Sequence, residues 1–459
     1  MIGMLICKCI SSRVSWICSK MEKEQGCHID IVLIGNIEVE DLLPCDIVVV
    51  EWELRHELFK VLQKMVKKNI VFFNDTFFLN LDDTDEAKGI IEIAMSQKKW
   101  EVCKGMNEFL LYGDIIRRRV KLHAFPRKLQ LETTDVCNAK CIMCSHAYSA
   151  GTGMDIFESK ILEKLAPYLP YLRTIVLHGN GEPFIKPNII QYLDYLSQYG
   201  IFFVTNTNLS IINDAILERL NRNFEEISVS CDAHCKELYE SIRVGLYFDT
   251  FVQNVIRVRE NCPNLHMNMA VIVMRQNLPY LDKIVEFAAN LGFQTVQFNQ
   301  LCVDLKCNNF NDSPILYKEE YVEAIKKIIA MAKKKHIAVT YPNITEIKEE
   351  KFTKIDKQNY HDHIQFEGIC DWLVESPFIN LRGDVGICCI NARDLMGNIF
   401  ETDFGEIWNS DAYCAMREDF YKMRVNPICK GCDFMMHGRL QYLKLINADL
   451  SALKKRSRE

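Results

Sequence analysis

Three cysteines in the first half of the chain have a spacing that suits a metal centre. Cys137, Cys141 and Cys144 form a C-x3-C-x2-C pattern within the segment LETTDVCNAKCIMCSHAYS. Thiolates on one short loop can converge on a single centre, because the chain needs only to wrap around it. Three protein ligands leave one position of a four-iron cluster open, and an open position is where chemistry can take place.

Zinc is the alternative occupant of this loop. His146 follows the last cysteine closely and would complete a set of three cysteines and one histidine, which zinc accepts. Residue spacing alone leaves both choices open. The location of the loop favours a cluster more strongly, since it follows a predicted strand at the edge where α/β folds build their active sites.

A second group of cysteines lies near the end of the chain. Its candidate ligands are Cys370, one of the neighbours Cys388 and Cys389, Cys429 and Cys432. The run INLRGDVGICC predicts a β-hairpin that turns at Gly383 and presents its cysteines toward the first one. We prefer Cys388 of the adjacent pair, although neighbours on a strand point to opposite faces. Four ligands make a closed site, which suits zinc as well as a second cluster.

Strands that alternate with helices are expected to position the first group. The strand-like runs are LQLETT, TIVLHGN, FFVTNTN, EISVSCD, MNMAVIVM and TVQFNQL, all between residues 129 and 301. Amphipathic segments such as NIIQYLDYLSQYG separate them. Six βα units in series predict a parallel sheet, either open or closed into a barrel.

The rest of the chain divides into further regions. Short apolar runs between residues 29 and 75, with one amphipathic segment among them, predict a parallel βαβ layer. The predicted domains are a Rossmann-like α/β domain at 1–95, a helical connector at 96–126, the barrel core at 127–345, a small cysteine-bearing domain at 346–438 and a basic tail at 439–459.

Composition excludes several classes of protein. The chain has 459 residues, of which 49% are hydrophobic, so it can bury the cores of two or three domains. A net charge of -6 gives no electrostatic case for nucleic acid or an anionic membrane. The chain contains 20 cysteines, which is an unusually high number, but disulfide frameworks are typical of short secreted chains. We find no export signal and no long apolar stretch, and therefore expect a cytoplasmic protein with reduced thiols.

Together these motifs resemble the radical S-adenosylmethionine (radical SAM) superfamily. Its signature is the C-x3-C-x2-C spacing with an apolar residue before the third cysteine, a place that Met143 fills. The run LHGNGEPF resembles the family's Gly-Gly-Glu-Pro motif, with Gly179, Gly181 and Glu182 in the matching places. The resemblance implies an α/β fold with a partial (β/α)6 TIM-like barrel. It also implies a 4Fe-4S cluster that binds SAM and cleaves it to a 5′-deoxyadenosyl radical, which abstracts hydrogen from a substrate.

The same resemblance implies further residues of a SAM site. Met143, Gly179, Gly181 and Glu182 would contact SAM, and Ser230 and Arg243 would bind its ribose and carboxylate. Asn206 lies at the same predicted rim, where an Asx turn is the alternative. The Ser-Cys-Asp run at Ser230 departs from the Ser-x-Asp-Gly ending of many relatives. Cys231 is the candidate catalytic hydrogen donor, although buried cysteines are common as small hydrophobes.

The C-terminal cysteines resemble those of the SPASM and twitch domains that follow radical SAM barrels. This resemblance implies one auxiliary 4Fe-4S cluster, held by Cys370, Cys388, Cys429 and Cys432. The expected partners are a peptide or small-molecule substrate and a reductant protein such as flavodoxin or ferredoxin, with neither nucleic acid nor membrane.

Maturation of a ribosomally made peptide is the expected function, by oxidation, cross-linking or epimerisation. The alternatives are a sugar or aminocyclitol dehydrogenase or epimerase of the same superfamily, a cobalamin-dependent radical methylase, and a zinc protein without catalysis. A methylase is less expected because the N-terminal region has no Asp-x-His-x-x-Gly motif for cobalamin.

Overall fold

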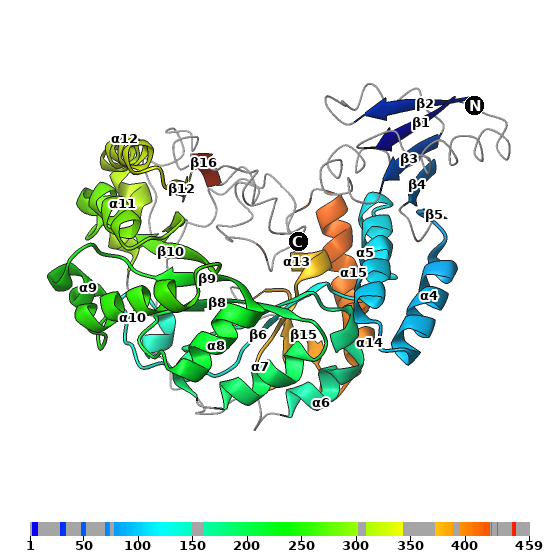
Figure 1. Ribbon diagram of the computed structural model, residues 1–459, viewed down its shortest axis with the longest axis horizontal. Coiled ribbons are helices and arrows are strands. Elements are labelled where there is room, and N and C mark those ends of the chain that lie inside the picture. Colours follow the sequence, from blue (N-terminus) through cyan, green and yellow to red (C-terminus); the bar gives the residue numbers. More distant parts are fainter. Residues whose placement is uncertain are drawn as a thin grey trace.

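A computed structural model describes most of the chain. The described residues are 2–7, 28–33, 47–51, 69–73, 78–148, 160–186, 188–301, 309–342, 372–388, 395–422, 424, 429 and 443–446. They form two β-sheets, one of five strands and one of eleven (Figure 1). Among these residues, no helix combines the length and the apolar character that a membrane span requires.

The N-terminal sheet is mostly parallel. Its strand order is β2-β1-β3-β4-β5, with β1 at Ile2–Cys7, β2 at His28–Leu33, β3 at Ile47–Glu51, β4 at Asn69–Phe73 and β5 at Phe78–Asn80. Only β5 runs antiparallel to its neighbour. The three predicted strands correspond to β2, β3 and β4. The apolar run at the N-terminus adds β1, which pairs in parallel with both β2 and β3. The predicted helix at 53–68 lies outside the described residues.

The second sheet contains the barrel. Its seven parallel strands are β6 (Lys128–Leu131), β7 (Thr174–Val176), β8 (Phe202–Thr207), β9 (Phe224–Ser230), β10 (His266–Val273), β11 (Thr295–Gln300) and β12 (Ala338–Pro342). All six predicted βα strands are confirmed. The described sheet ends in β15 on one side and β16 on the other, so that the barrel is open.

Helices cover the outer face of this curved sheet, as Figure 1 shows for α7, α8 and α10. The helices are α6 (Ile161–Leu165), α7 (Ile189–Ser197), α8 (Asp214–Asn223), α9 (Lys236–Ile242), α10 (Phe248–Asn261), α11 (Leu281–Asn290) and α12 (Lys318–Lys335). Short 3-10 turns lie at Ser145–Tyr148, Ala166–Tyr171, Pro183–Ile185, Leu278–Tyr280, Phe310–Asp312 and Pro314–Tyr317. Apolar residues of the helices, such as Leu193 and Val255, share one core with Phe203 and Val229 of the strands.

The C-terminal region continues the barrel sheet. It comprises α13 (Trp372–Glu375), β13 (Phe378–Ile379), β14 (Asp384–Gly386), β15 (Leu395–Asn398), α14 (Phe404–Trp408) and α15 (Asp411–Tyr421). Strand β13 pairs in parallel with β6, and β14 returns antiparallel to β13. The turn between them contains Gly383 at φ +82, in the left-handed region that glycine adopts readily. This confirms the predicted hairpin.

The predicted basic tail contains a strand. Residues Leu443–Ile446 form β16, which pairs antiparallel with β12. Without β16, the backbone groups along one side of β12 would be an unpaired sheet edge. The short apolar run LKLI supplies the partner, a role that composition alone did not indicate.

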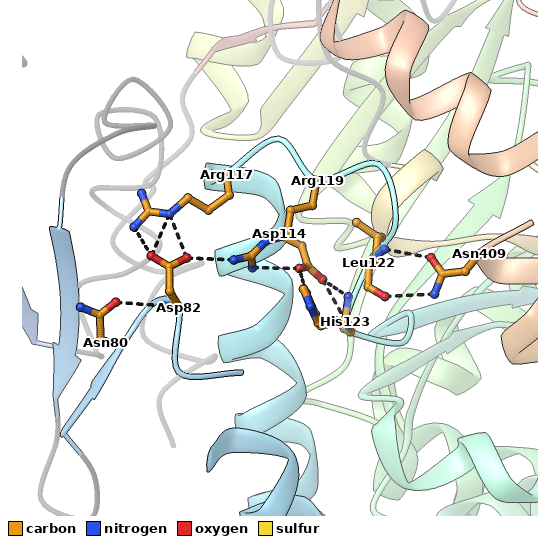
Figure 2. A network of polar contacts seen from close by, with 9 residues as sticks. Asn80, Asp82, Asp114, Arg117, Arg119, Leu122, His123 and Asn409 are labelled. Atoms are coloured by element: carbon orange, nitrogen blue, oxygen red, sulfur yellow. Dashed lines mark hydrogen bonds and ion pairs between the residues drawn. The ribbon is translucent and has the colours of Figure 1, made fainter. Parts of the chain in front are cut away.

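Two helices connect the N-terminal sheet to the barrel. They are α4 (Thr84–Ser96) and α5 (Trp100–Ile116). Figure 2 shows the polar network at this junction. Asp82, just after β5, pairs with Arg117 at 2.7 Å and with Arg119 at 2.8 Å. Fully buried Asp114 of α5 accepts hydrogen bonds from the backbone of His123, and Asn409 exchanges hydrogen bonds with the backbone of Leu122. The network therefore links α5 to the chain on both sides.

Candidate functional site

The cysteine loop leaves β6 at the carboxyl end of the parallel strands. Cys141 is buried, Cys137 is half-buried and Cys144 is exposed. Burial is the main cause that raises the pKa of Cys137 to about 11, and repulsion from Glu182, Cys141 and Cys144 contributes to this value. Burial likewise raises the pKa of Cys141. The thiols thus lie close enough to interact, as three thiolates that bind one iron-sulfur cluster must. This donor set fits such a cluster.

Mononuclear metal sites have a tighter geometry. Within the part of the chain that the structure describes, no group of three or more His, Cys, Asp or Glu side chains gathers closely enough to hold one metal ion. His146, the candidate fourth ligand of zinc, lies in the 3-10 turn that follows the loop and is half-buried.

Backbone hydrogen bonds fix the cysteine loop against the segment that follows α9. The amide of Lys140 donates to the carbonyl of Val244 at 2.7 Å, and the amide of Ile142 donates to that of Ile242 at 3.1 Å. Gly245, at φ +92, lies against the backbone of Asn138. These contacts place the end of α9, including Arg243, beside the loop although about 100 residues separate them in sequence.

Arg243 is buried beside Cys141. Its guanidinium forms an ion pair with Asp232 at 2.7 Å, and Nη1 donates to the sulfur of Cys141 at 3.8 Å. The residue predicted to bind the SAM carboxylate therefore already has two partners within the chain. The sequence analysis did not select Asp232 as a site residue. It noted Asp232 only as part of the Ser-Cys-Asp run, which departs from the Ser-x-Asp-Gly ending of many relatives.

The two motif glycines lie against the neighbouring loop. A side chain at Gly181 would place its Cβ 2.3 Å from the carbonyl oxygen of Thr134, and one at Gly179 would meet Glu132 at 2.6 Å. Glycine at these positions lets the loop after β7 pack on the loop after β6. The predicted contact of both glycines with SAM stays a prediction.

Glu182 joins the loops after β7 and β8. One carboxylate oxygen accepts from the hydroxyl of Thr207 at 2.6 Å and the other from the amide of Asn208 at 2.7 Å. Burial raises the pKa of Glu182 to about 6. Each carboxylate oxygen has two acceptor positions, so Glu182 retains capacity for a further donor such as an ammonium group. The sequence analysis did not select Thr207. The alternation of side chains along a strand does not indicate which residue of another loop will accept a hydrogen bond from it.

Asn206 and Ser230 belong to the inner face of the barrel. Along β8, Phe203, Thr205 and Thr207 are buried while Asn206 is exposed. Ser230 is half-buried at the end of β9. Asn206 pairs in register with Ser228, which lies two residues before Ser230 on the same face of β9. The structure therefore brings both predicted residues to the open side of the sheet.

Met143 and His178 complete the surroundings of the loops. Met143 is half-buried and packs against a small apolar cluster that includes Ile242 and Met274. His178 immediately precedes Gly179, and its Nδ1 is buried with no hydrogen-bond partner in the described part of the chain. Burial lowers the pKa of His178 to about 4, so the imidazole is neutral at neutral pH. The sequence analysis did not select His178.

Cys231 lies in the core of the barrel wall and not on its inner face. It is fully buried, its thiol donates to the carbonyl of Ala233 at 3.2 Å, and burial raises its pKa to about 12. Successive residues of a strand point to opposite faces, so the inner face next to it belongs to Ser230. The hydrogen-donor role of Cys231 stays a prediction.

The second cysteine group is only partly within the described residues. Cys388 follows β14 and is half-buried, and Cys429 is also half-buried. Cys370, Cys389 and Cys432 lie outside the described residues. The proposed four-cysteine set and the choice of Cys388 over its neighbour therefore stay predictions.

Comparison with known families agrees with both cysteine groups. The radical SAM superfamily model matches residues 131–288, and the SPASM iron-sulfur cluster-binding domain matches residues 370–433. The chain belongs to the radical SAM superfamily and carries a SPASM domain. SAM and a 4Fe-4S cluster are therefore its cofactors, together with auxiliary iron-sulfur clusters in the SPASM domain. The SPASM match begins at the first predicted ligand of the second group and ends one residue after the last.

Curated relatives of this radical SAM chain carry different names. An uncharacterised protein of Methanocaldococcus jannaschii is 25% identical over 185 residues, which cover 38% of this chain and 63% of the relative. A protein of Saccharolobus islandicus named probable GTP 3′,8-cyclase is 26% identical over 218 residues, 46% of this chain and 70% of that protein. The AdoMet-dependent heme synthase of Methanosarcina barkeri is 21% identical over 311 residues, 64% of this chain and 85% of the synthase.

Solved structures share the fold of this radical SAM chain. Streptococcus suis SuiB bound to S-adenosylmethionine has a TM-score of 0.53 at 14% identity, covering 79% of this chain and 90% of SuiB. Native anSMEcpe with bound AdoMet has a TM-score of 0.50 at 17% identity, covering 67% of this chain and 87% of that protein. These similarities confirm the predicted barrel with its small C-terminal domain.

Proposed function

We propose that this radical SAM enzyme modifies a ribosomally made peptide by oxidation, cross-linking or epimerisation. The observation that carries the proposal is the junction of the SPASM domain with the barrel. Strand β13 pairs with β6, the strand that leads directly into the cysteine loop, so the SPASM domain borders the candidate site. SuiB, which shares this fold with a TM-score of 0.52, has been solved bound to its precursor peptide SuiA.

The residues have distinct roles in this proposal. Cys137, Cys141 and Cys144 hold the SAM-binding cluster, and Glu182 with the backbone of its loop receives the ammonium group of SAM. When bound, the cluster supplies the electron that cleaves SAM, and the resulting 5′-deoxyadenosyl radical takes hydrogen from the substrate. Flavodoxin or ferredoxin is the proposed reductant.

A row of uncharged polar side chains lies on the inner face, and its exposed member, Asn206, supports a peptide substrate. Asn206, Ser228, Asn268 and Thr295 form one row across four strands, since each pairs in register with the next. Amide and hydroxyl groups can both donate and accept hydrogen bonds, as the peptide backbone does. The row ends near the floor of the barrel, where Asn268 also donates to Glu226.

Formation of 5′-deoxyadenosine tests the radical chemistry. Protein purified without oxygen and reconstituted with iron and sulfide is reduced with dithionite in the presence of SAM. We expect 5′-deoxyadenosine and methionine in equal amounts. A variant with Cys137, Cys141 and Cys144 changed to alanine serves as the matched control. Reconstituted wild-type protein that yields no more 5′-deoxyadenosine than this variant would overturn the proposal.

Peptide modification is tested separately. Short peptides encoded beside the gene are incubated with enzyme, SAM and reductant, and are then analysed by mass spectrometry and chiral amino-acid analysis. We expect the loss of two hydrogens or the inversion of one residue. If the peptides remain unchanged while a sugar or aminocyclitol is oxidised or epimerised, the peptide proposal is wrong and the sugar alternative replaces it.

A further inference from the structure

A buried charge pair lies behind the cysteine loop. Asp232 is fully buried at the end of β9, and one of its carboxylate oxygens accepts from both Nε and Nη2 of Arg243 at 2.7 Å. The other oxygen accepts from the backbone amide of Ile272 at 2.7 Å. Asn277 donates to the carbonyl of Asp232 at 3.1 Å, which anchors the residue to the segment after β10. The carboxylate is thus held by the backbone of β10 and by the arginine that follows α9.

This anchoring fixes where the guanidinium points. The arginine fork is planar and rigid, so pairing of two of its nitrogens with Asp232 determines the position of the third. That third nitrogen, Nη1, lies 3.8 Å from the sulfur of Cys141, within reach of an N–H···S hydrogen bond. The backbone of Arg243 is also tied down, because its amide donates to Tyr239 at 2.7 Å and it directly follows Ile242, which bonds to the cysteine loop.

We infer that Arg243, oriented by Asp232, is a positioning residue that raises the reduction potential of the SAM-binding cluster through the sulfur of Cys141. The inference rests on the proposed function, in that Cys141 is taken as a cluster ligand. Hydrogen bonds to cluster sulfurs and the charge around a cluster set its potential. A cation and an N–H donor beside a ligand sulfur stabilise the more negative, reduced state. Reduction by a protein donor then becomes easier.

The alternative role of Arg243 is the one that the resemblance implied, binding of the SAM carboxylate. A bidentate contact with a carboxylate uses two nitrogens of the fork. In this chain Asp232 already provides such a carboxylate at the Nε and Nη2 positions. The ion pair is buried, so breaking it to bind SAM would leave the charge of Asp232 uncompensated. The geometry therefore favours action on the cluster over action on SAM.

A redox titration of the reconstituted holoenzyme tests this inference. The double variant Asp232→Asn, Arg243→Gln removes both charges, and Arg243→Lys retains the charge but not the fork. The control double variant Asp214→Asn, Arg257→Gln removes a matched pair at the surface, where Asp214 is 96% exposed. Midpoint potentials are read from the EPR signal of the reduced cluster, and SAM affinity from the change in that signal on adding SAM.

We expect a lower midpoint potential in the double variant, a smaller decrease in Arg243→Lys, and no change in the surface control. SAM affinity should stay the same in all of them. Unchanged potentials together with weakened SAM binding would overturn the inference and assign Arg243 to the SAM carboxylate. If the double variant takes up no cluster, Arg243→Lys alone tests the inference. A lower midpoint potential in Arg243→Lys supports it, and an unchanged potential with weakened SAM binding overturns it. A wild-type protein without a SAM-responsive cluster signal would instead contradict the proposed function.

Discussion

Gly181 is the residue of the candidate site that tolerates change least. Its Cβ position lies 2.3 Å from the carbonyl oxygen of Thr134 and 2.6 Å from that of Val136, and backbone atoms have no room to move aside. We expect Gly181→Ala to destabilise the apoprotein by about 3 kcal/mol, the upper end of the usual cost of overpacking, and to reduce cluster uptake. Urea unfolding and iron analysis measure both effects.

The matched control for this substitution is Gly89→Ala in α4. No atom lies within 4 Å of the Cβ position there. Alanine in a helix is favoured over glycine, so this variant should gain about 0.5–1 kcal/mol. Equal stability of the two alanine variants would contradict the close packing of the loops after β6 and β7.

Glu182 makes stability depend on pH. Burial raises its pKa from 4.5 to about 6, so the folded protein binds this proton more tightly than the unfolded chain does. The stabilisation from this proton is complete below about pH 4.5 and is lost as the pH rises through about 6. Relative to Glu182→Gln, which does not titrate, the wild-type protein should lose about 2 kcal/mol over that window.

Urea unfolding of the apoprotein at several pH values measures this loss. The control is Glu286→Gln. The ion pair with Lys335 lowers the pKa of Glu286, so the contribution of Glu286 to stability should increase with pH, opposite to that of Glu182. A difference between wild type and Glu182→Gln that stays constant with pH would show that the carboxyl is not titrating in a buried environment.

At the scale of elements, Glu132 connects three parts of the sheet. One of its carboxylate oxygens accepts from the backbone and side chain of Asn180 at 3.0 Å, in the loop after β7. The other accepts from the amide of Leu381 at 3.3 Å, in the turn after β13. In Glu132→Gln an NH2 group takes the place of one accepting carboxylate oxygen and faces N–H donors. This substitution should lower the free energy of unfolding by about 1–3 kcal/mol.

Unfolding measurements and limited proteolysis of the SPASM domain test this connection. Glu418→Gln is the control, since it removes an exposed ion pair with Lys422 at the end of α15, and such surface pairs contribute little to stability. If the two variants have the same stability and the same cleavage rate, Glu132 does not hold the hairpin to the barrel.

The elements themselves were largely predictable from sequence, and their connections were not. The seven barrel strands are apolar runs between amphipathic helices, a pattern that local periodicity contains. The pairing of β13 with β6 and of β16 with β12 joins segments more than 100 residues apart, and short strands carry little pattern. The cysteine spacing is likewise local, whereas Asp232 and Thr207 acquire their roles only when other strands fold beside them.

At the scale of the whole molecule, the connector holds the C-terminal domain as well as the N-terminal sheet. The indole of Trp408 donates to the carbonyl of Ala124 at 3.1 Å, and fully buried Arg417 donates to the carbonyls of Val120 and Leu373. These bonds attach α14 and α15 to the segment between α5 and β6. Together with the β13–β6 pairing, they give the SPASM domain two separate attachments, one to the connector and one to the barrel.

Such an arrangement allows the two cysteine groups to be separated by experiment. The double variant Cys429→Ala, Cys432→Ala should lose about four irons per chain, the content of one cluster, because the second site loses half of its proposed ligands. It should still form 5′-deoxyadenosine, since the cysteine loop after β6 has its own ligands and its own backbone support. Iron and sulfide analysis with a parallel SAM cleavage assay measures both.

Cys414→Ser is the control for this experiment. Its half-buried thiol donates to the carbonyl of Asn409, just before α15, at 3.6 Å, and a serine hydroxyl can make the same hydrogen bond. Iron content should therefore stay at the wild-type value. If the iron content of the Cys429, Cys432 double variant is unchanged, these two residues are not ligands of the auxiliary site. If the wild-type chain binds one zinc ion and the double variant loses it, the second site is a zinc site. Loss of SAM cleavage together with the second cluster would mean that the two attachments of the SPASM domain also support the geometry of the first.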